Sequence, residues 1–107
     1  MIEIEIYNDN GDYEFLARGH AQYNSGQDIV CSAVSALSYA LKYALESVDA
    51  DIRDYTAEFA SGHMQLALYS KDDVVMTIFG VVIIGLLQIE KKYPDNVKVL
   101  LDGFEDL

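Results

Sequence analysis

The sequence predicts an α+β fold in which a single sheet, antiparallel or mixed, carries two long helices in the order ββαββαβ. Three observations lead to this fold class. Two pairs of strand-like segments each flank a short turn, two long apolar stretches have the length or spacing of helices, and a short apolar segment closes the chain. With 107 residues, the chain is expected to form one domain, residues 1–107, with a single core.

The first strand pair is predicted from residues 1–18. Residues 1–7 alternate isoleucine with glutamate, which is typical of a strand with one buried face. The Asn, Asp and Gly cluster at 8–12 predicts a turn, and residues 13–18 (YEFLAR) supply the returning strand. Gly19 ends that strand, so His20 is expected at the rim of the sheet.

A first helix is predicted from Asp28 to about Val48, because Asp is a favoured N-cap residue. Residues 21–27 then form a polar loop ahead of it. On this helix Cys31 and Ser35 are one turn apart, so both side chains are expected to point the same way. The apolar residues at helical spacing are Ile29, Val30, Ala33, Val34, Leu37, Leu41 and Leu45.

The second half of the chain repeats this plan. Residues 51–60 and 63–70 flank a Ser-Gly turn and predict a second hairpin. Ser70 and the acids at 72–73 resemble a helix start of the Ser-x-x-acid type. The β-branched segment that follows suits two buried strands by periodicity, but its length and its stop before Pro94 favour a helix. Residues 97–101 are expected to form the last strand.

Composition limits the classes of partner. With 18 acidic and 7 basic residues, the formal net charge is −11, which repels phosphate backbones and excludes direct binding of nucleic acid while favouring a basic protein partner. The apolar run 74–89 is shorter than the roughly 18 to 20 residues of a membrane span, so no membrane contact is expected. The N-terminus has no signal-peptide pattern. One cysteine excludes an internal disulfide and fits a reducing cytoplasm.

Cys31 and His20 are the candidate catalytic pair. If Asp28 caps the helix, Cys31 is at about its third residue, where free N–H groups and the helix dipole favour a thiolate. Peptide cleavage by cysteine needs that thiolate and an imidazole to carry the proton. The backbone N–H of Cys31 is then a natural oxyanion donor. No zinc site or phosphate-binding loop is expected, and no cofactor.

Structural interpretations of the same residues remain open. Cys31 could be a small buried apolar residue, and His20 a rim histidine bonded to the backbone. Asp28 could serve only as the helix cap. The Ser35 hydroxyl could bond the carbonyl four residues back. His63, beside the second turn, is expected on the surface.

Several motifs together resemble the ribosomal-processing cysteine protease family (Prp-like). They are GHA at 19–21, G-x-DIVC at 26–31 and AVSAL at 33–37, with weaker similarity over 85–99 (GLLQIEKKYPDNVKV). The similarity spans nearly the whole chain and its order of elements. Ten residues separate His20 from Cys31, about one fewer than in typical members, so the loop between them is where this chain is expected to differ.

The resemblance implies a bacterial cytoplasmic endopeptidase that removes the N-terminal extension of a large-subunit ribosomal protein precursor. It assigns Cys31 as the nucleophile and His20 as the general base and acid, with Asp28 and Ser35 in support. The resemblance also implies a homodimer, which fits a second helix that is apolar on nearly all sides. The loop expected to shape the substrate entrance contains Gln22, Tyr23, Asn24, Ser25 and Gly26.

Two other functions remain open from the sequence. One is a non-enzymatic, ribosome-associated interaction module in which Cys31 is buried and inert. The other is a thiol redox sensor, which would need an intermolecular partner because the chain has no second cysteine. The rate of alkylation by iodoacetamide as a function of pH separates an inert thiol from an activated one.

Overall fold

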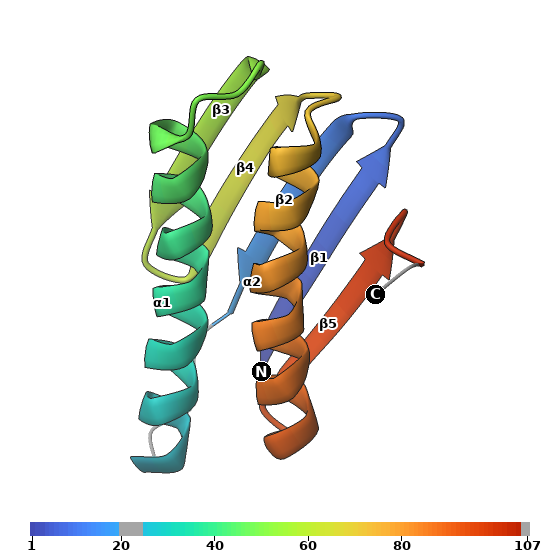
Figure 1. Cartoon of the computed structure of the whole chain (residues 1–107). Coiled ribbons are helices and arrows are strands. Elements are labelled where there is room, and N and C mark those ends of the chain that lie inside the picture. The colour runs from blue at the N-terminus through green and yellow to red at the C-terminus, as the bar shows by residue number, and fades with distance from the viewer. Residues whose placement is uncertain (20–24, 106–107) are drawn as a thin grey trace.

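The computed structural model of this chain describes residues 1–19 and 25–105, and no side chains are described for residues 25–28. The elements follow in the predicted order ββαββαβ (Figure 1). They are β1 (Ile2–Asp9), β2 (Asp12–Arg18), α1 (Ser25–Ser47), β3 (Arg53–Ala60), β4 (His63–Tyr69), α2 (Asp73–Lys92) and β5 (Val97–Asp102).

The five strands form one sheet in the order β3-β4-β2-β1-β5. Both predicted hairpins are confirmed, because β1 pairs with β2 and β3 pairs with β4 in antiparallel fashion. β2 and β4 are also antiparallel, whereas β5 lies parallel to β1. The sheet is therefore mixed, and the chain between β4 and β5 includes α2.

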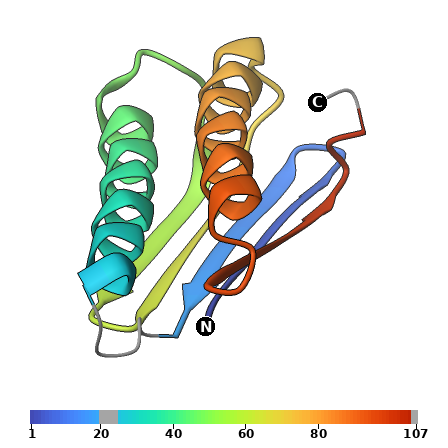
Figure 2. The same cartoon turned by 90° about the horizontal axis from the view of Figure 1, so that it is seen from below.

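Both helices cover the same face of the sheet (Figures 1 and 2). α1 lies over the β3–β4 side, where the ring of Tyr39 meets Phe59 edge-on at 5.2 Å. α2 lies towards β2, where Phe79 stacks on Tyr13 at 4.6 Å. The core between the layers contains the fully buried side chains of Ile4, Ile6, Phe15, Val30, Leu41, Leu66, Val75, Phe79, Ile83, Leu86 and Val97.

The two helices also pack closely against each other. A Cβ atom at Gly85 would lie 2.9 Å from Cδ1 of Leu37, so glycine is what allows this approach.

By length and composition alone, residues 29–47 and 73–92 could each cross a membrane. Here each of these helices buries one face on the sheet, and core helices of soluble proteins pass the same test.

α2 begins differently from the prediction. Its N-cap is Asp72, whose carboxylate accepts a hydrogen bond from the Val74 N–H at 3.1 Å. Ser70, predicted to start the helix, is buried and accepts from the Asp72 N–H at 3.0 Å while donating to the Asp51 carbonyl at 2.8 Å. Ser70 therefore ties the helix start to the segment before β3, and Asp72 satisfies the first free N–H group.

The predicted start of α1 at Asp28 is also wrong. The helix begins at Ser25, so Ser25, Gly26 and Gln27 belong to its first turn and not to a loop. The segment contains no proline, so nothing in its backbone prevents the earlier start. Asp28 becomes the fourth helical residue, where an acidic side chain complements the positive end of the helix dipole.

The last turns of α1 are tied to the edge strand β3. The hydroxyl of Tyr55 donates to Glu46 at 2.6 Å, and Nζ of Lys42 lies 3.0 Å from the same carboxylate. Burial and then the bond to Glu46 raise the pKa of Tyr55. The hydrogen bonds from Tyr55 and then Lys42 lower the pKa of Glu46.

Replacing Tyr55 with Phe should therefore lower the stability of the fold in a pH-dependent way. A depressed Glu46 pKa stabilises the fold above the ordinary carboxyl value and ceases to do so as the pH falls through the folded-state pKa. We expect Tyr55→Phe to be less stable than wild type in urea unfolding at about pH 7, and the difference to shrink towards about pH 3. An equal difference at both pH values would contradict this role.

Candidate active site

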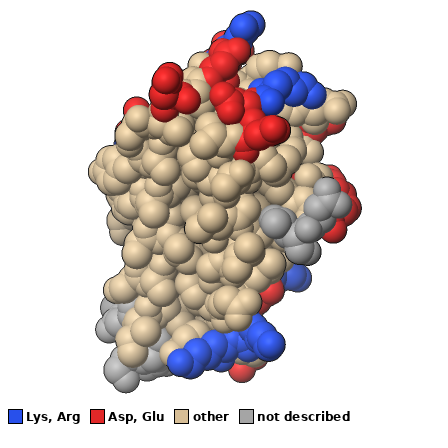
Figure 3. All heavy atoms as spheres, in the orientation of Figure 1, with Lys and Arg blue, Asp and Glu red and all other residues tan. Residues whose placement is uncertain are grey.

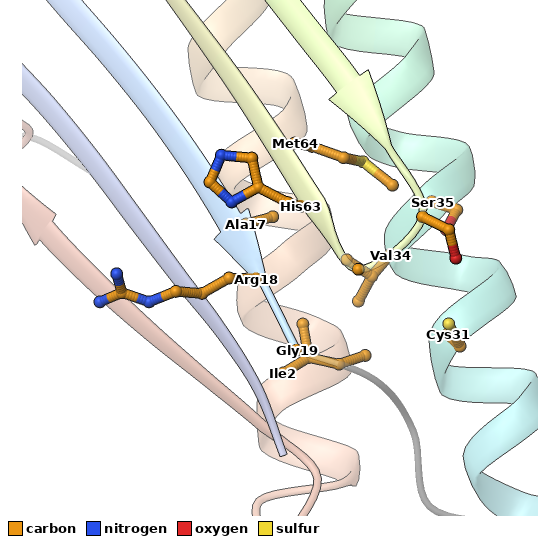
Figure 4. Close-up of a pocket in the computed structure, with 11 residues that line it drawn as sticks. Ile2, Ala17, Arg18, Gly19, Cys31, Val34, Ser35, His63 and Met64 are labelled. Atoms are coloured by element: carbon orange, nitrogen blue, oxygen red, sulfur yellow. The ribbon is translucent and has the colours of Figure 1, made fainter.

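A cavity of about 90 Å³ lies where β2 ends, between α1 and the turn that joins β3 to β4 (Figure 4). Its wall is mostly apolar, with one thiol and a few polar groups. The lining residues are Ile2, Ala17, Arg18, Gly19, Cys31, Val34, Ser35, Ser61, Gly62, His63 and Met64. The cavity thus brings together residues that are far apart in the sequence.

Cys31 and Ser35 both line this cavity, which confirms that they share one side of α1. Their direction is set by the buried neighbours Val30 and Val34, which anchor the adjacent stripe of the helix in the core. The thiol of Cys31 is free and partly exposed. This position argues against the interpretation of Cys31 as a fully buried structural residue.

Cys31 lies deeper in the helix than predicted. Because α1 begins at Ser25, Cys31 is its seventh residue and not its third. The N–H groups that lack an intrahelical partner belong to the first turn, and the dipole effect falls off over the same distance. As the seventh helical residue, Cys31 has an N–H within the helical ladder, which weakens the reason for its predicted oxyanion role.

Gly19 fixes the chain at the edge of the cavity. Its φ of +106° lies in the region that favours glycine, and a Cβ there would overlap the carbonyl oxygen of Met1. Its N–H donates to the Gly62 carbonyl at 3.0 Å. Gly19 is therefore held in place at the end of β2, and the next residue in the sequence is His20.

Several predicted site residues cannot be compared with this geometry. His20, Gln22, Tyr23 and Asn24 lie outside the described residues. Asp28 lies in α1, but its side chain also lies outside the description. The pairing of His20 with Cys31 therefore stays a prediction.

His63 contributes to the site in a way that the sequence reasoning missed. It is exposed, as predicted, but it also lines the cavity from the first position of β4. Its imidazole points away from Cys31 (Figure 4), so it does not serve as the partner of the thiol in this arrangement. The placement of His63 follows from strand pairing. His63 pairs with Arg18, which brings the turn between β3 and β4 level with the end of β2.

The charges around the cavity are few. The guanidinium of Arg18 lies 3.7 Å from the carboxylate of Glu3 and 3.6 Å from that of Glu5, on the exposed side of the sheet. Within the described part of the chain, no three His, Cys, Asp or Glu residues are placed to hold a metal ion. The chemistry that this cavity offers is that of a thiol and hydroxyl groups beside an apolar wall.

Comparison with known proteins decides which chemistry this is. The sequence model of the family described as "Cysteine protease Prp" matches residues 1–98. The chain belongs to the cysteine protease Prp family. The ribosomal processing cysteine protease Prp of Staphylococcus aureus (strain Mu50 / ATCC 700699) is 26% identical over 103 residues, covering 92% of this chain and 97% of that protein.

Solved structures share the fold. The crystal structure of an essential ribosomal processing protease Prp from S. aureus, in complex with a covalently linked product peptide, has a TM-score of 0.76 at 24% identity and covers 94% of this chain and 99% of that one. SMU.848 from Streptococcus mutans has a TM-score of 0.75 at 25% identity, covering 95% and 97%. The resemblance to the Prp family and the fold class are thus confirmed, and the chain is a cysteine protease.

Replacing Gly19 with Ala tests whether this backbone position is required. The added Cβ meets the Met1 carbonyl oxygen and forces a residue with a side chain into a positive φ. We expect a loss of about 1–3 kcal/mol in unfolding free energy, measured by urea denaturation. Unchanged stability would show that the path of the chain past the cavity adapts freely.

Proposed function

We propose that this protein is a cytoplasmic endopeptidase that removes the N-terminal extension of a large-subunit ribosomal protein precursor, with Cys31 as nucleophile and His20 as general base and acid. The carrying observation is a partly exposed Cys31 in a cavity whose wall includes Gly19, the residue before His20, in a chain of the Prp family. Another structure of the S. aureus Prp contains a substrate peptide. This supports a peptide substrate for the present chain as well.

The first half of the proposed reaction forms an acyl-enzyme. His20 takes the thiol proton, and the sulfur of Cys31 attacks the carbonyl carbon of the scissile peptide bond. The tetrahedral intermediate collapses as its C–N bond breaks, and His20 gives the proton to the leaving amine. The extension is left joined to Cys31 as a thioester, and the mature ribosomal protein departs with a new N-terminus.

The second half hydrolyses the thioester. His20 removes a proton from water, the hydroxide attacks the acyl carbon, and the C–S bond breaks. The extension leaves with a free carboxylate, and the sulfur recovers its proton. Asp28 would favour the imidazolium form of His20 by its negative charge. Ser35, one turn beyond Cys31, also lines the cavity, which supports a role for its hydroxyl in bonding the sulfur or the substrate.

The charge of the chain fits this substrate class. With a formal net charge of −11, the enzyme attracts a basic precursor protein and repels nucleic acid. The role requires no cofactor, because the thiol and the imidazole supply the nucleophile and the proton carrier. Residues Gln22 to Gly26, the last two of which begin α1, would contact the substrate near the scissile bond.

Replacing Cys31 with Ala tests the proposed chemistry directly. We expect cleavage of a purified precursor to fall by about 10³-fold or more, because the nucleophile is lost. Ser32→Ala serves as the matched control, since Ser32 is the exposed next residue of the same helix and does not line the cavity. If Cys31→Ala cleaves as fast as wild type, measured by mass spectrometry of the products, the mechanism is wrong.

We also propose that the enzyme is a homodimer joined through the outer face of α1 and α2. No Asp, Glu, Lys or Arg occurs in residues 29–41 or 74–89, and Figure 3 shows that the middle of this face is free of charge. Exposed apolar residues lie on it, among them Val81 at 64% and Ile84 at 52%. Two copies of charge −11 can approach at such a face without bringing carboxylates together.

Replacing Val81 with Asp should convert the dimer to a monomer. The new charge lies at the centre of the proposed interface, where a carboxylate would be buried without a partner. Sedimentation equilibrium measures the mass, and Thr56→Asp on the opposite face of the sheet is the control. A wild-type mass of one 11.9 kDa chain, or a dimer that survives Val81→Asp, would contradict this interface.

A further inference from the structure

No element among the described residues covers the face of the sheet opposite the helices (Figure 2). Because side chains alternate along a strand, the polar residues of each strand gather on this face. In β1 these are Glu3, Glu5 and Tyr7, and in β2 they include Asp12 and Glu14. The face thus carries several carboxylates on β1 and β2.

The acids concentrate at the end of this face that is farther from Cys31. A shallow depression of about 390 Å³ lies there between β1, β2, β3 and β4. Its polar wall contains the carboxylates of Asp9, Asp12, Glu14 and Asp54 and the phenol rings of Tyr7 and Tyr69.

Asp54 lies at an irregularity in β3. The pairing of β3 with β4 shifts register between Arg53 and Thr56, and Asp54 has a φ of +54°. Asp is one of the residues that tolerate this left-handed region. Asp54 lines the depression, so the edge strand β3 supplies its fourth carboxylate.

The four carboxylates have no cationic partner among the described residues. The ion pairs found there join Arg18 to Glu3 and Glu5, Lys42 to Glu46 and Arg53 to Asp51.

The acids of the open face also affect the pKa of Tyr7. Burial raises the pKa of Tyr7, and the charges of Glu5, Glu14 and Asp102 raise it further, against the opposing effect of Arg18. A metal site does not account for the gathering of carboxylates in the depression. Within the described residues, no three His, Cys, Asp or Glu side chains are placed to hold a metal ion.

The chemistry of this face selects its occupant. Carboxylates without partners attract Lys and Arg side chains, and tyrosine rings contact such cations through their faces. Nucleic acid and acidic proteins would be repelled. We propose that the open sheet face docks a Lys- and Arg-rich segment of the protein substrate, apart from the cleavage site; this rests on the proposed function.

The position of the face suits a second contact with the same substrate. β2 runs from Asp12 in the depression to Arg18 at the cavity of Cys31, a span of about 20 Å along the strand. An extended chain of about six or seven residues covers that distance. A substrate can thus be held by its basic segment while its scissile bond lies at the thiol.

Binding to a cationic probe tests the docking without any cleavage. In the Cys31→Ala background, the affinity for a fluorescein-labelled octalysine peptide is measured by anisotropy at low salt. The face variant carries Asp9→Asn, Glu14→Gln and Asp54→Asn, and the matched control carries Asp49→Asn, Asp95→Asn and Glu105→Gln at exposed sites outside the depression. Both change the net charge equally. We expect about five- to tenfold weaker binding for the face variant and less than about twofold for the control.

Cleavage of two substrates then shows whether the face variant affects docking or the cleavage site. With Cys31 intact, the face variant should have a raised KM for the full precursor and unchanged kinetics on a short peptide that spans the cleavage site and lacks basic residues. Normal kinetics on the short peptide also show that the variant is folded, and Glu14→Gln alone should give a smaller shift in the same direction.

Three results would overturn the docking. They are no binding of octalysine to the parent, equal loss in face and control variants, or an unchanged KM for the precursor. The last result leaves the protease role intact. If even the wild type cleaves neither substrate, the proposed function fails, and the octalysine titrations still decide whether the face binds cations.

Discussion

The packing of one stripe of α1 onto the sheet is the constraint on which the site depends. Val30, Val34, Leu41 and Leu45 are buried along this stripe, so the helix cannot rotate without exposing a core side chain. Cys31 and Ser35 follow Val30 and Val34 directly and are therefore held at the edge of the core, facing the cavity. The burial of the neighbouring apolar side chains thus orients the thiol of Cys31. The cavity residues are not needed to fix this orientation.

The two sides of the sheet carry different kinds of side chain. The helical side buries the core and presents an outer face whose middle is free of charge, while the open side carries carboxylates and tyrosines. The cavity with Cys31 lies at the end of the sheet, between α1 and the turn that joins β3 to β4. The proposed substrate docking, self-association and bond cleavage would therefore use separate surfaces, so that a change in one need not disturb the others.

Much of this fold was predictable from the sequence because alternation and helical spacing are local signals. The starts of α1 and α2 were missed because several residues compete as caps: Asp72 caps α2 while Ser70 bonds the Asp51 carbonyl. In the site, the shared direction of Cys31 and Ser35 follows from helical periodicity. The role of His63 depends on strand pairing, which comes from tertiary structure and leaves no mark in the local sequence. The irregular pairing at Asp54 likewise depends on the partner strand β4.

The central claim is that the sulfur of Cys31 becomes bonded to the acyl group of the substrate. Rapid acid quenching during turnover of the precursor, followed by peptide mapping in a mass spectrometer, measures this directly. The account predicts a thioester that joins the cleaved N-terminal extension to Cys31 and that disappears when the reaction is complete. Turnover with no such adduct, or with the extension attached to another residue, would contradict it.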